Sequence, residues 1–577
     1  MTHLNGNGKE IVSVTEQNMV GNTPLRFGFP PGGIGAPSDD LLPLHDRVAA
    51  KLLARQAAVA PERPFVHVSG RWVTYGEADL RGNRVANALA AIGVKKGDRV
   101  AILLRNRIEY LDIWFGLSRL GAIEVPINID YHAPQILQTF RRAPITVVVV
   151  ERGLYAELGA AISELGQRPI VVELDSEKDH AEHCAIKYDD LIKAAADTPP
   201  IGMEDVSGAD TGAVMNTSGT TGPSKGVCIS HAQQYILGRM IAADSDLNAD
   251  EVFYNFFPLF HNTAQAMITI PVLLVGARMV LTERFSASRF WPEVIQHGCT
   301  AFYFIGEIMR ILLKSTTADE ARGSKLRVGW GIGAASQDFT EFQARFGVVL
   351  RTGYGSTEGN VPCYLPHGSA KVESVGRPVA GFEVRIADEF GESVKTGLQG
   401  EILVRSYEPC ALMLGYDGDA SATVAAWKDL WFHTGDAGIL DVDGDLYFKG
   451  RVKDSIRVRG ENISAFEVEQ AIGEIPAVVE VAAVAVPSEL GGDDLKVVVV
   501  VSEGSALLHE ELVAHAQQRL PRYSIPRYVE FVKVLPKTPT NKVQKHVLRA
   551  NPFTPATWDR EAAGVKVKSK HSQQRNG

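Results

Sequence analysis

The sequence predicts an α/β protein of more than one domain, and three observations carry this prediction. Over most of the chain, segments with a helical apolar period alternate with short apolar runs, which is the pattern of parallel βαβ units. Near residues 375–450 the pattern changes to short alternating segments between Gly-rich turns, typical of a small antiparallel β unit. After Arg451, strands and helices alternate in a shorter, more charged stretch, which predicts a compact α+β domain. A chain of 577 residues with 45% hydrophobic residues can fill several cores.

The first region carries distinct helix and strand signals. Val85, Ala88, Leu89 and Ile92 recur at the spacing of one helix face, which predicts an amphipathic helix. The apolar run 100–104 after the Gly97-Asp98 turn is typical of a buried parallel strand. Further strands of this kind are predicted at 123–127, 146–150 and 169–172.

The later regions divide the chain further. Strands at 383–386 and 401–404 make up the predicted antiparallel unit, whereas strands at 481–486 and 496–501 and helices near 466–472 and 508–519 build the last domain. The Gly-, Asn- and Pro-rich start predicts a flexible arm, and the basic end predicts a flexible tail. The predicted boundaries are an arm at 1–40, a large domain at 41–453, a small mobile domain at 454–560 and a tail at 561–577.

Composition excludes several classes of partner. The net charge is −9 and the pI is near 6.0, so no overall basic field attracts nucleic acid or anionic lipid. The 5 cysteines form no CxxC pair, which argues against a disulfide framework or a zinc site. No apolar run reaches the roughly 18 residues of a membrane span, and the N-terminal residues lack an apolar signal core. We therefore expect a cytoplasmic protein with neither a nucleic acid nor a membrane as partner.

Residues 217–227, Thr-Ser-Gly-Thr-Thr-Gly-Pro-Ser-Lys-Gly-Val, follow the end of a predicted buried strand at 213–215. Such a loop offers backbone N–H groups and hydroxyls to phosphate oxygens, and its glycines let the chain approach a ligand closely. It is not a Walker A loop, because Ser224 precedes Lys225 and Gly226 follows it. Alone, the segment predicts either a phosphate-binding loop or a polar strand-to-helix turn. The candidate phosphate ligands are Thr217, Ser218, Gly219, Thr220, Thr221, Gly222 and Lys225.

Other segments carry residue types suited to a nucleotide. In the stretch Tyr354-Gly355-Ser356-Thr357-Glu358, the aromatic ring can stack on adenine, Thr357 can donate to a phosphate oxygen and Glu358 is a hard oxygen ligand for Mg²⁺. Asp436, in His-Thr-Gly-Asp, can accept hydrogen bonds from both ribose hydroxyls. Small residues at 331–335 leave room for a flat base. Further candidates are Arg451 after Gly450, Lys542 in Thr-Asn-Lys-Val, and His261 in Pro-Leu-Phe-His.

Taken in this order, the segments resemble the adenylate-forming superfamily, and in particular its acyl-CoA synthetases and AMP-dependent CoA ligases. The segment at 450–464 is most similar to carnitine/crotonobetaine-type CoA ligases; it reads Gly-Arg-Val-Lys-Asp-Ser-Ile-Arg-Val-Arg-Gly-Glu-Asn-Ile-Ser. The resemblance covers roughly residues 48–550. Two positions depart from it: Asn541 replaces the glycine before the catalytic lysine, and Ala465 replaces a proline. Asn tolerates the left-handed backbone better than most residues, so the loop can keep its shape.

The resemblance implies a fold and a set of roles. It implies a large N-terminal domain of two αβ-layered subdomains plus a small β-barrel-like unit, hinged at Asp454 to the small α+β domain. It makes Lys542, His261 and Thr357 catalytic, Glu358 the metal ligand, and Gly460, Glu461 and Asn462 the loop on the coenzyme A side. The nucleotide ligands it implies, beyond the phosphate loop, are Gly333, Ala334, Ala335, Tyr354, Gly355, Ser356, Thr357, Glu358, Asp436 and Arg451, and the acyl pocket would contain His261, Asn262, Gln265 and Gly331.

The implied function is ATP-dependent activation of a carboxylic acid to an acyl-adenylate, followed by transfer to coenzyme A, with Mg²⁺ as cofactor. Two alternatives stay open. One is an adenylation-only enzyme that passes its acyl-AMP to a carrier protein or partner enzyme. The other is a non-catalytic nucleotide-binding protein, against which the joint presence of Lys542, Glu358, Asp436 and Arg451 argues. A homodimer is common among relatives, and the sequence does not identify the acid.

Overall fold

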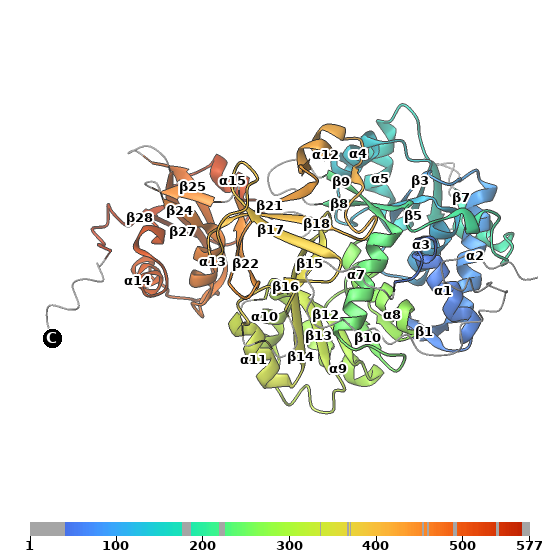
Figure 1. The fold of residues 1–577 in the computed structure, drawn as a ribbon, viewed down its shortest axis with the longest axis horizontal. Coiled ribbons are helices and arrows are strands. Elements are labelled where there is room, and N and C mark those ends of the chain that lie inside the picture. Colours follow the sequence, from blue (N-terminus) through green and yellow to red (C-terminus); the bar gives the residue numbers. More distant parts are fainter. Residues whose placement is uncertain are drawn as a thin grey trace, which may run out of the picture.

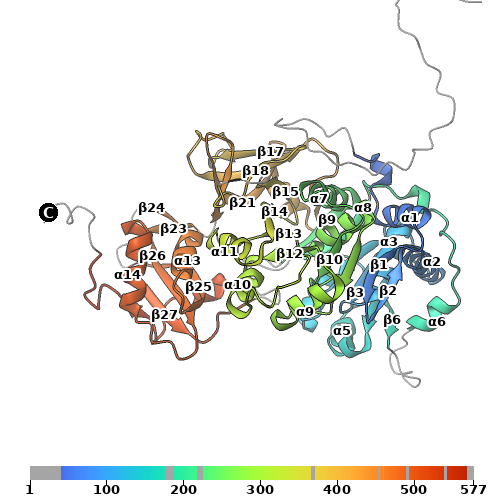
Figure 2. The same cartoon turned by 90° about the horizontal axis from the view of Figure 1, so that it is seen from below.

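The computed structural model describes residues 41–175, 186–217, 225–334, 336–365, 369, 371–452, 455–458, 461–488, 493–537 and 542–567. The predicted arm at 1–40 lies outside the described residues. The elements form two large, mainly parallel sheets, an antiparallel sheet and a C-terminal unit, which lies at one end of the molecule in both Figure 1 and Figure 2. The mixed α/β class predicted from the sequence is confirmed.

The first sheet contains the strands predicted at 100–104, 123–127, 146–150 and 169–172. Its order is β19 (Gly415–Tyr416), β9 (Lys225–Ser230), β8 (Thr211–Thr217), β4 (Ile123–Pro126), β3 (Arg99–Leu103), β5 (Val147–Glu151), β6 (Ile170–Leu174) and β7 (Ile186–Lys187). Pairing is parallel from β8 to β7 and antiparallel between β8, β9 and β19. Alternate valines of β5 enter two different cores, Val147 and Val149 one and Val148 and Val150 the other. Burial on both faces explains why the strand is a continuous apolar run.

The second sheet lies beside the first and shares its main core. Its order is β16 (Arg377–Pro378), β15 (Asn360–Tyr364), β14 (Val349–Ser356), β13 (Val328–Ile332), β12 (Ala301–Ile305), β10 (Val252–Asn255), β11 (Arg278–Leu281), β1 (Pro64–Val68) and β2 (Arg71–Thr74). The strands from β1 through β10 to β14 pair in parallel, so their carboxyl ends share one edge. Ligands of open α/β sheets bind outside such an edge.

Helices cover and separate the two sheets. The predicted amphipathic helix is part of α2 (Tyr75–Ala91), and its Val85, Ala88 and Leu89 are buried as predicted. In α7 (His231–Asp244), Gly238 permits close packing, since a Cβ there would lie 2.4 Å from Ile270 Cγ2. The other helices of this region are α1 (Ala49–Val59), α3 (Ile108–Leu120), α4 (Ala133–Arg142), α5 (Tyr155–Ser163), α6 (Tyr188–Lys193), a π-helix (Thr263–Thr269), α8 (Ile270–Val275), α9 (Ala287–His297), α10 (Gly306–Ser315), α11 (Ser336–Phe346) and α12 (Ala420–Ala426).

The antiparallel unit predicted near 375–450 is present. It contains β17 (Phe382–Ala387), β18 (Gly400–Ser406), β21 (Trp431–Leu440), β20 (Trp427–Lys428) and β22 (Leu446–Arg451). β22 is the last strand before the C-terminal unit. There, Lys449 forms a 2.7 Å ion pair with Glu467, and the rings of Phe448 and Phe466 meet edge to face at 5.3 Å.

The C-terminal unit has its own apolar core. It contains the hairpin β23 (Ser455–Val458) and β24 (Glu461–Ser464), the sheet of β25 (Val478–Pro487), β26 (Asp493–Val501), β27 (Tyr528–Val532) and β28 (Trp558–Asp559), and helices α13 (Ala465–Gly473), α14 (His509–Arg519) and α15 (Lys545–Ala550). Val565 and Val567 pack against this core, so the packed chain enters the stretch predicted as a tail; residues 568–577 lie outside the described residues.

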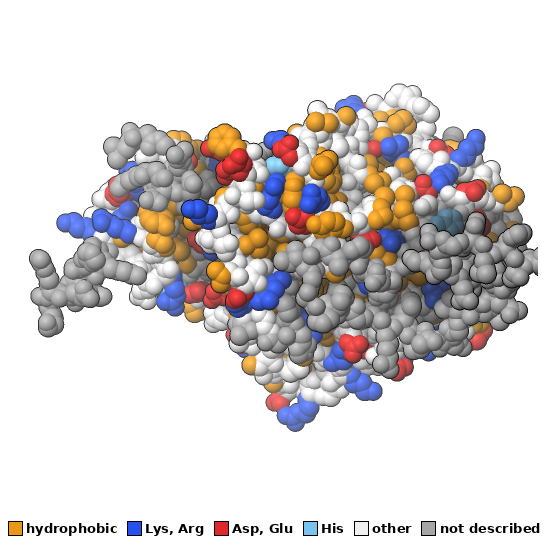
Figure 3. All heavy atoms as spheres, in the orientation of Figure 1, with side chains coloured by type: hydrophobic (Ala, Val, Ile, Leu, Met, Phe, Trp, Pro, Cys, Tyr) orange, Lys and Arg blue, Asp and Glu red, His pale blue; other side chains and the backbone are white. Residues whose placement is uncertain are grey.

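The surface and the helix lengths bear on partners. On the face seen in Figure 3, basic and acidic side chains of the described residues are interspersed rather than gathered in one stripe. Within the described ranges, no helix is both long enough and apolar enough to cross a membrane.

Candidate active site

Asp436, Arg451 and Tyr354 meet at the junction of the antiparallel unit and the second sheet. Strand register sets Asp436 of β21 opposite Arg451 of β22, and Arg451 Nε lies 2.8 Å from Asp436 Oδ1. The Tyr354 hydroxyl donates to Asp436 Oδ2 at 2.6 Å. Burial raises the pKa of Asp436, and Arg451 and the Tyr354 hydrogen bond oppose this rise. The result is a buried carboxylate with its two oxygens held in fixed directions.

A cavity of about 630 Å³ opens beside this carboxylate, between the second sheet and the C-terminal unit. The predicted nucleotide residues that line it are Gly333, Ala334, Tyr354, Gly355, Asp436 and Arg451. Gly333 has a φ of +74°, in the left-handed region that favours glycine. Ala335 lies outside the described residues. Gly331, predicted in the acyl pocket, is buried in β13, where a Cβ would lie 2.2 Å from the Phe304 carbonyl oxygen.

The predicted phosphate loop connects two antiparallel strands. β8 ends at Thr217 and β9 begins at Lys225, and these two residues are register partners. The Thr217 hydroxyl donates to the Lys225 carbonyl oxygen at 3.3 Å, which closes the base of the loop. The alternative of a strand-to-helix turn is wrong, because a strand follows the loop. The predicted ligands Ser218, Gly219, Thr220, Thr221 and Gly222 lie outside the described residues.

Tyr416 links the loop lysine to the predicted metal ligand. The Lys225 ammonium lies 4.3 Å from the centre of the Tyr416 ring, a cation–π distance, and the Tyr416 hydroxyl donates to Glu358 Oε1 at 3.4 Å. Tyr416 reaches this place because β19 pairs with β9. Sequence reasoning missed Tyr416, since no local motif marks it.

The segment around Glu358 is held through its backbone. Gln233 Nε2 of α7 donates to the Thr357 carbonyl oxygen at 2.8 Å, and the Met413 N–H donates to that of Glu358 at 2.9 Å. Ser356 Oγ accepts from the Gly359 N–H at 2.9 Å. Among the described residues, no cation forms a direct ion pair with the half-buried Glu358 carboxylate. Carboxylate oxygens such as these are hard ligands.

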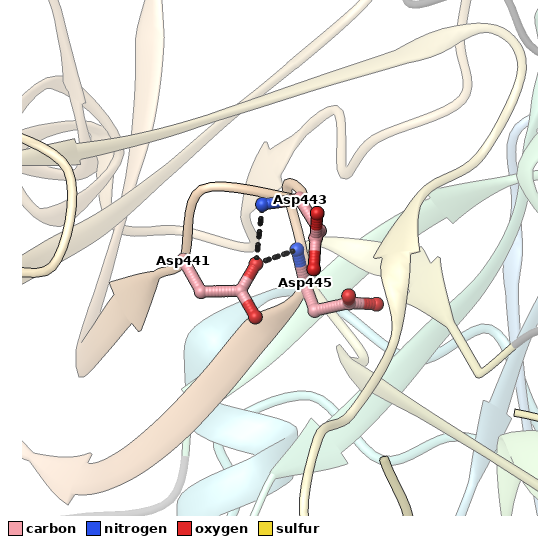
Figure 4. Close-up of side chains that lie close together, drawn as sticks. All are labelled: Asp441, Asp443 and Asp445. Atoms are coloured by element: carbon pink, nitrogen blue, oxygen red, sulfur yellow. Dashed lines mark hydrogen bonds between the residues drawn. The ribbon is translucent and has the colours of Figure 1, made fainter. Parts of the chain in front are cut away.

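A different group of carboxylates lies on the turn between β21 and β22. Figure 4 shows Asp441, Asp443 and Asp445, whose ligand atoms lie within 4.8 Å of one another. Lys371 Nζ donates to all three at 2.6, 2.6 and 2.8 Å. Asp441 Oδ1 also accepts the N–H groups of Asp443 and Asp445, both at 2.9 Å. The Lys371 ammonium lies where a metal ion would bind these three carboxylates. The three aspartates and Lys371 therefore stabilise the turn.

His261 and Lys542 come from different units, and Lys542 affects the pKa of His261. His261 Nδ1 accepts the Thr263 N–H at 3.2 Å, so the neutral ring carries its proton on Nε2. Desolvation, with Lys542 adding to it, lowers the pKa of His261 to about 4. Desolvation followed by Arg451 lowers the pKa of Lys542, and Glu358 and Asp436 oppose this. The structure therefore brings the predicted lysine into the electrostatic field of four predicted site residues.

The loop that carries Lys542 is anchored at its base. Lys537 and Val543 form an antiparallel bridge across it, and the Gln544 N–H donates to the Pro536 carbonyl oxygen at 2.8 Å. Asn541, which departs from the family pattern, lies outside the described residues, as do Asp454 and Gly460. Glu461 and Asn462 belong to β24.

Gln265 does not face a pocket. It has 0% exposure, and its Nε2 donates to the Glu124 carboxylate at 2.9 and 3.0 Å and to the Leu259 carbonyl oxygen at 2.9 Å. The prediction that Gln265 lines the acyl pocket is therefore wrong, because its side chain is fully buried and its amide forms hydrogen bonds inside the core. Its neighbour Asn262 is half-buried and His261 is exposed, and neither residue lines the cavity beside Asp436.

The chain matches two family models and is similar to several known proteins. The family described as AMP-binding enzyme matches residues 53–417, and the AMP-binding enzyme C-terminal domain matches 467–542. A crotonobetaine/carnitine–CoA ligase of Proteus mirabilis is 31% identical over 520 residues, which cover 88% of this chain and 97% of that protein. The anthranilate CoA ligase AuaEII, solved with anthranoyl-AMP, is 25% identical with a TM-score of 0.81, covering 91% of this chain and 99% of that one. ATP-bound MatB from Rhodopseudomonas palustris is 25% identical with a TM-score of 0.78, covering 87% and 98%.

Proposed function

The chain belongs to the AMP-binding enzyme family, and from this premise we propose that it activates a carboxylic acid with ATP and transfers the acyl group to coenzyme A. Relatives named as CoA ligases, and neighbours solved with ATP or an acyl-adenylate, support both steps. The reaction class is that of an AMP-forming acid–thiol ligase.

In the first step, a carboxylate oxygen of the acid attacks the α-phosphorus of ATP. The bond from that phosphorus to the bridging oxygen breaks, and pyrophosphate leaves with the electron pair. Lys542 would neutralise charge shared by the carboxylate and the α-phosphate, while Lys225 and its loop would hold the departing phosphates. Tyr354, Asp436 and Arg451 line the cavity that would hold the nucleoside. His261, neutral near pH 7 and carrying a proton on Nε2, would donate a hydrogen bond without adding charge.

One observation carries this proposal furthest. Lys542 belongs to the C-terminal unit, whereas Glu358 and Asp436 belong to the large unit, yet all three interact electrostatically. Although it is exposed, Lys542 lies within electrostatic reach of Arg451, Glu358 and Asp436, as a group that stabilises charge in the transition state must.

Glu358 is the residue that we propose as the Mg²⁺ ligand. The arrangement fits, because its carboxylate is half-buried and has a weak 3.4 Å hydrogen bond from Tyr416, whose ring contacts Lys225, the lysine proposed to hold phosphate. Mg²⁺ typically takes one or two protein carboxylates together with substrate phosphates, and when bound it neutralises phosphate charge.

In the second step, the thiolate of coenzyme A attacks the acyl carbon and the bond to AMP breaks. We propose that residues 454–560 rotate about Asp454 between the steps, which withdraws Lys542 and presents the loop at 460–462. Asp454→Pro should stiffen the hinge and slow alternation between the half-reactions. Normal rates of both half-reactions in this variant would remove Asp454 from the hinge role.

The test is a panel of carboxylic acids assayed for acid-dependent pyrophosphate exchange, and then for AMP and thioester with and without coenzyme A. We expect exchange with a subset of acids, and thioester only when coenzyme A is present. Exchange without thioester would favour the adenylation-only alternative, with a carrier protein or partner enzyme as acceptor. ATP binding without exchange across the panel would favour the non-catalytic alternative. A homodimer and a cytoplasmic location stay predictions, checked by light scattering and by cell fractionation.

A further inference from the structure

A network of buried hydrogen bonds runs from the first sheet to Asn262, the residue after His261. The Tyr110 hydroxyl of α3 donates to Glu124 Oε1 of β4 at 2.8 Å, and Gln265 Nε2 donates to both Glu124 oxygens. Gln234 Nε2 of α7 donates to Gln265 Oε1 at 2.9 Å and to Asn262 Oδ1 at 3.3 Å. The first four residues are buried, with Glu124 and Gln265 both at 0% exposure. Only Asn262, at the end of the chain, is half-buried.

The Gln265 amide can take only one orientation, and this sets which atom donates and which accepts in each bond that follows. Gln265 Nε2 has two hydrogens, of which one meets the Glu124 carboxylate and the other meets the Leu259 carbonyl oxygen. Turning the Gln265 amide over would set its oxygen against the Leu259 carbonyl oxygen, which can never donate. This conflict would persist even with Glu124 protonated, so the orientation does not depend on the charge of Glu124.

The orientation of the Gln265 amide determines the orientations of the Gln234 and Asn262 amides. Because Gln265 presents its oxygen to Gln234, Gln234 must present its amide hydrogens, one to Gln265 and the other to Asn262. Asn262 therefore accepts through Oδ1 and turns its own NH₂ group away from the core. No described residue accepts a hydrogen bond from Asn262 Nδ2. The Asn262 Nδ2 donor therefore has a fixed direction. It belongs to the residue that follows His261, whose pKa Lys542 helps to lower.

We propose that Asn262 Nδ2 is a specificity group that recognises a hydrogen-bond-accepting oxygen on the acid, so that the substrate carries a hydroxyl, ether or carbonyl oxygen close to its reacting carboxylate. This deepens the proposed function and rests on it. Tyr110, Glu124, Gln265 and Gln234 act through Asn262 and are positioning residues. Glu124 is a buried carboxyl with no cation among its hydrogen-bond partners, and burial raises its pKa to about 8. Burial of such a group is costly, and the hydrogen bonds from Tyr110 and Gln265 offset part of that cost.

The experiment compares matched pairs of acids that differ only in one oxygen substituent, by pyrophosphate exchange. The wild-type protein should prefer the oxygenated member in kcat/KM by about tenfold or more. Asn262→Leu, which keeps the size but removes the amide, should reduce this ratio about tenfold. Asn262→Asp presents only acceptors, so it should still select hydroxy acids, which can donate, while losing its preference for oxo and ether acids.

Controls separate the possible failures. Asn87→Leu removes an exposed amide that contacts the carbonyl oxygens of Ala196 and Thr198, and it should leave the ratio unchanged. Gln265→Glu removes the donors that face Leu259 and should lower the ratio in the same direction as Asn262→Leu, with folding checked by thermal melting. No exchange with any acid in the wild type would overturn the proposed function. Exchange with a ratio that Asn262→Leu and Asn262→Asp leave unchanged would overturn only the role of Asn262.

Discussion

Tyr354 donates its hydroxyl hydrogen to Asp436 Oδ2 at 2.6 Å, and this bond joins the end of β14 to the middle of β21 across 82 residues of sequence. Arg451 approaches the other oxygen of the same carboxylate at 2.8 Å. Because a neighbouring strand and a neighbouring sheet each hold one oxygen, the carboxylate has a fixed plane. A ligand with two adjacent hydroxyls could then meet it without first ordering it.

Asp436→Asn should raise the KM for ATP by about 10- to 100-fold, the scale of losing a hydrogen bond to a charged group. The measurement compares ATP with its 2′-deoxy and 3′-deoxy analogues. Wild type should discriminate against both analogues, and the variant should not. Asp443→Asn changes an exposed aspartate held by Lys371, and it serves as the control. Retained discrimination in Asp436→Asn would exclude Asp436 as the ribose ligand.

Lys542→Ala should suppress adenylation by about 10²–10³-fold, because it removes a preorganised charge from the reacting atoms. Thioester formation from a supplied acyl-adenylate should persist, since that step does not need this lysine. Lys545→Ala is the matched control, as Lys545 pairs with Glu469 at 2.7 Å within the C-terminal unit. Near-normal pyrophosphate exchange in Lys542→Ala would contradict the assignment.

The imidazole of His261 should titrate well below the usual value for histidine, near pH 4, when followed by NMR. Its folded pKa lies below the unfolded value, so the unfolded state binds more protons between about pH 4 and 6.5, and stability falls as the pH drops through this window. Lys542→Ala should raise the pKa of His261, because the lysine is the second cause of the shift. An unchanged pKa in that variant would show that Lys542 does not reach His261 in solution.

Tyr416 should matter for phosphate binding through its ring more than through its hydroxyl. Tyr416→Phe keeps the cation–π contact with Lys225, so pyrophosphate affinity should change by less than about threefold. Tyr416→Leu removes the ring, and affinity should fall by about 3- to 30-fold, the range of a cation–π contact. Isothermal titration with pyrophosphate measures both. Equal effects of the two substitutions would assign the role to the hydroxyl and Glu358 instead.

Tyr303→Phe should stabilise the protein or leave its stability unchanged. The Tyr303 hydroxyl is buried and has no hydrogen-bond partner among the described residues, while its ring stacks on Trp330 at 5.9 Å. An unsatisfied buried hydroxyl costs about 1–3 kcal/mol, and Phe keeps the ring contacts. Urea unfolding gives the difference, with Tyr254→Phe as a contrast, since Tyr254 donates to Glu293 at 2.5 Å and its loss should destabilise. A clear loss of stability in Tyr303→Phe would reveal a partner for the hydroxyl.

Much of the fold followed from local pattern. The apolar runs at 100–104, 123–127 and 146–150 became β3, β4 and β5, and the stripe in α2 is buried, because secondary-structure period and burial are properties of neighbouring residues. The site residues Tyr354, Asp436 and Arg451 could likewise be named from short motifs, and the structure brings them together at one cavity.

What the sequence by itself determined, then, were the elements and the segments that carry reactive or ligand-binding residue types, including the predicted phosphate loop and Lys542. Only the tertiary structure decided how those segments are used. Gln265 was expected at the substrate, yet it is buried against Glu124, which lies 141 residues away in sequence, and Tyr416 reaches Lys225 only because β19 pairs with β9. A side chain's partner depends on contacts between elements distant in the chain, and no local spacing encodes those contacts. The direction of the Asn262 amide shows this most clearly, because it is set by the Leu259 carbonyl oxygen through two intervening glutamines.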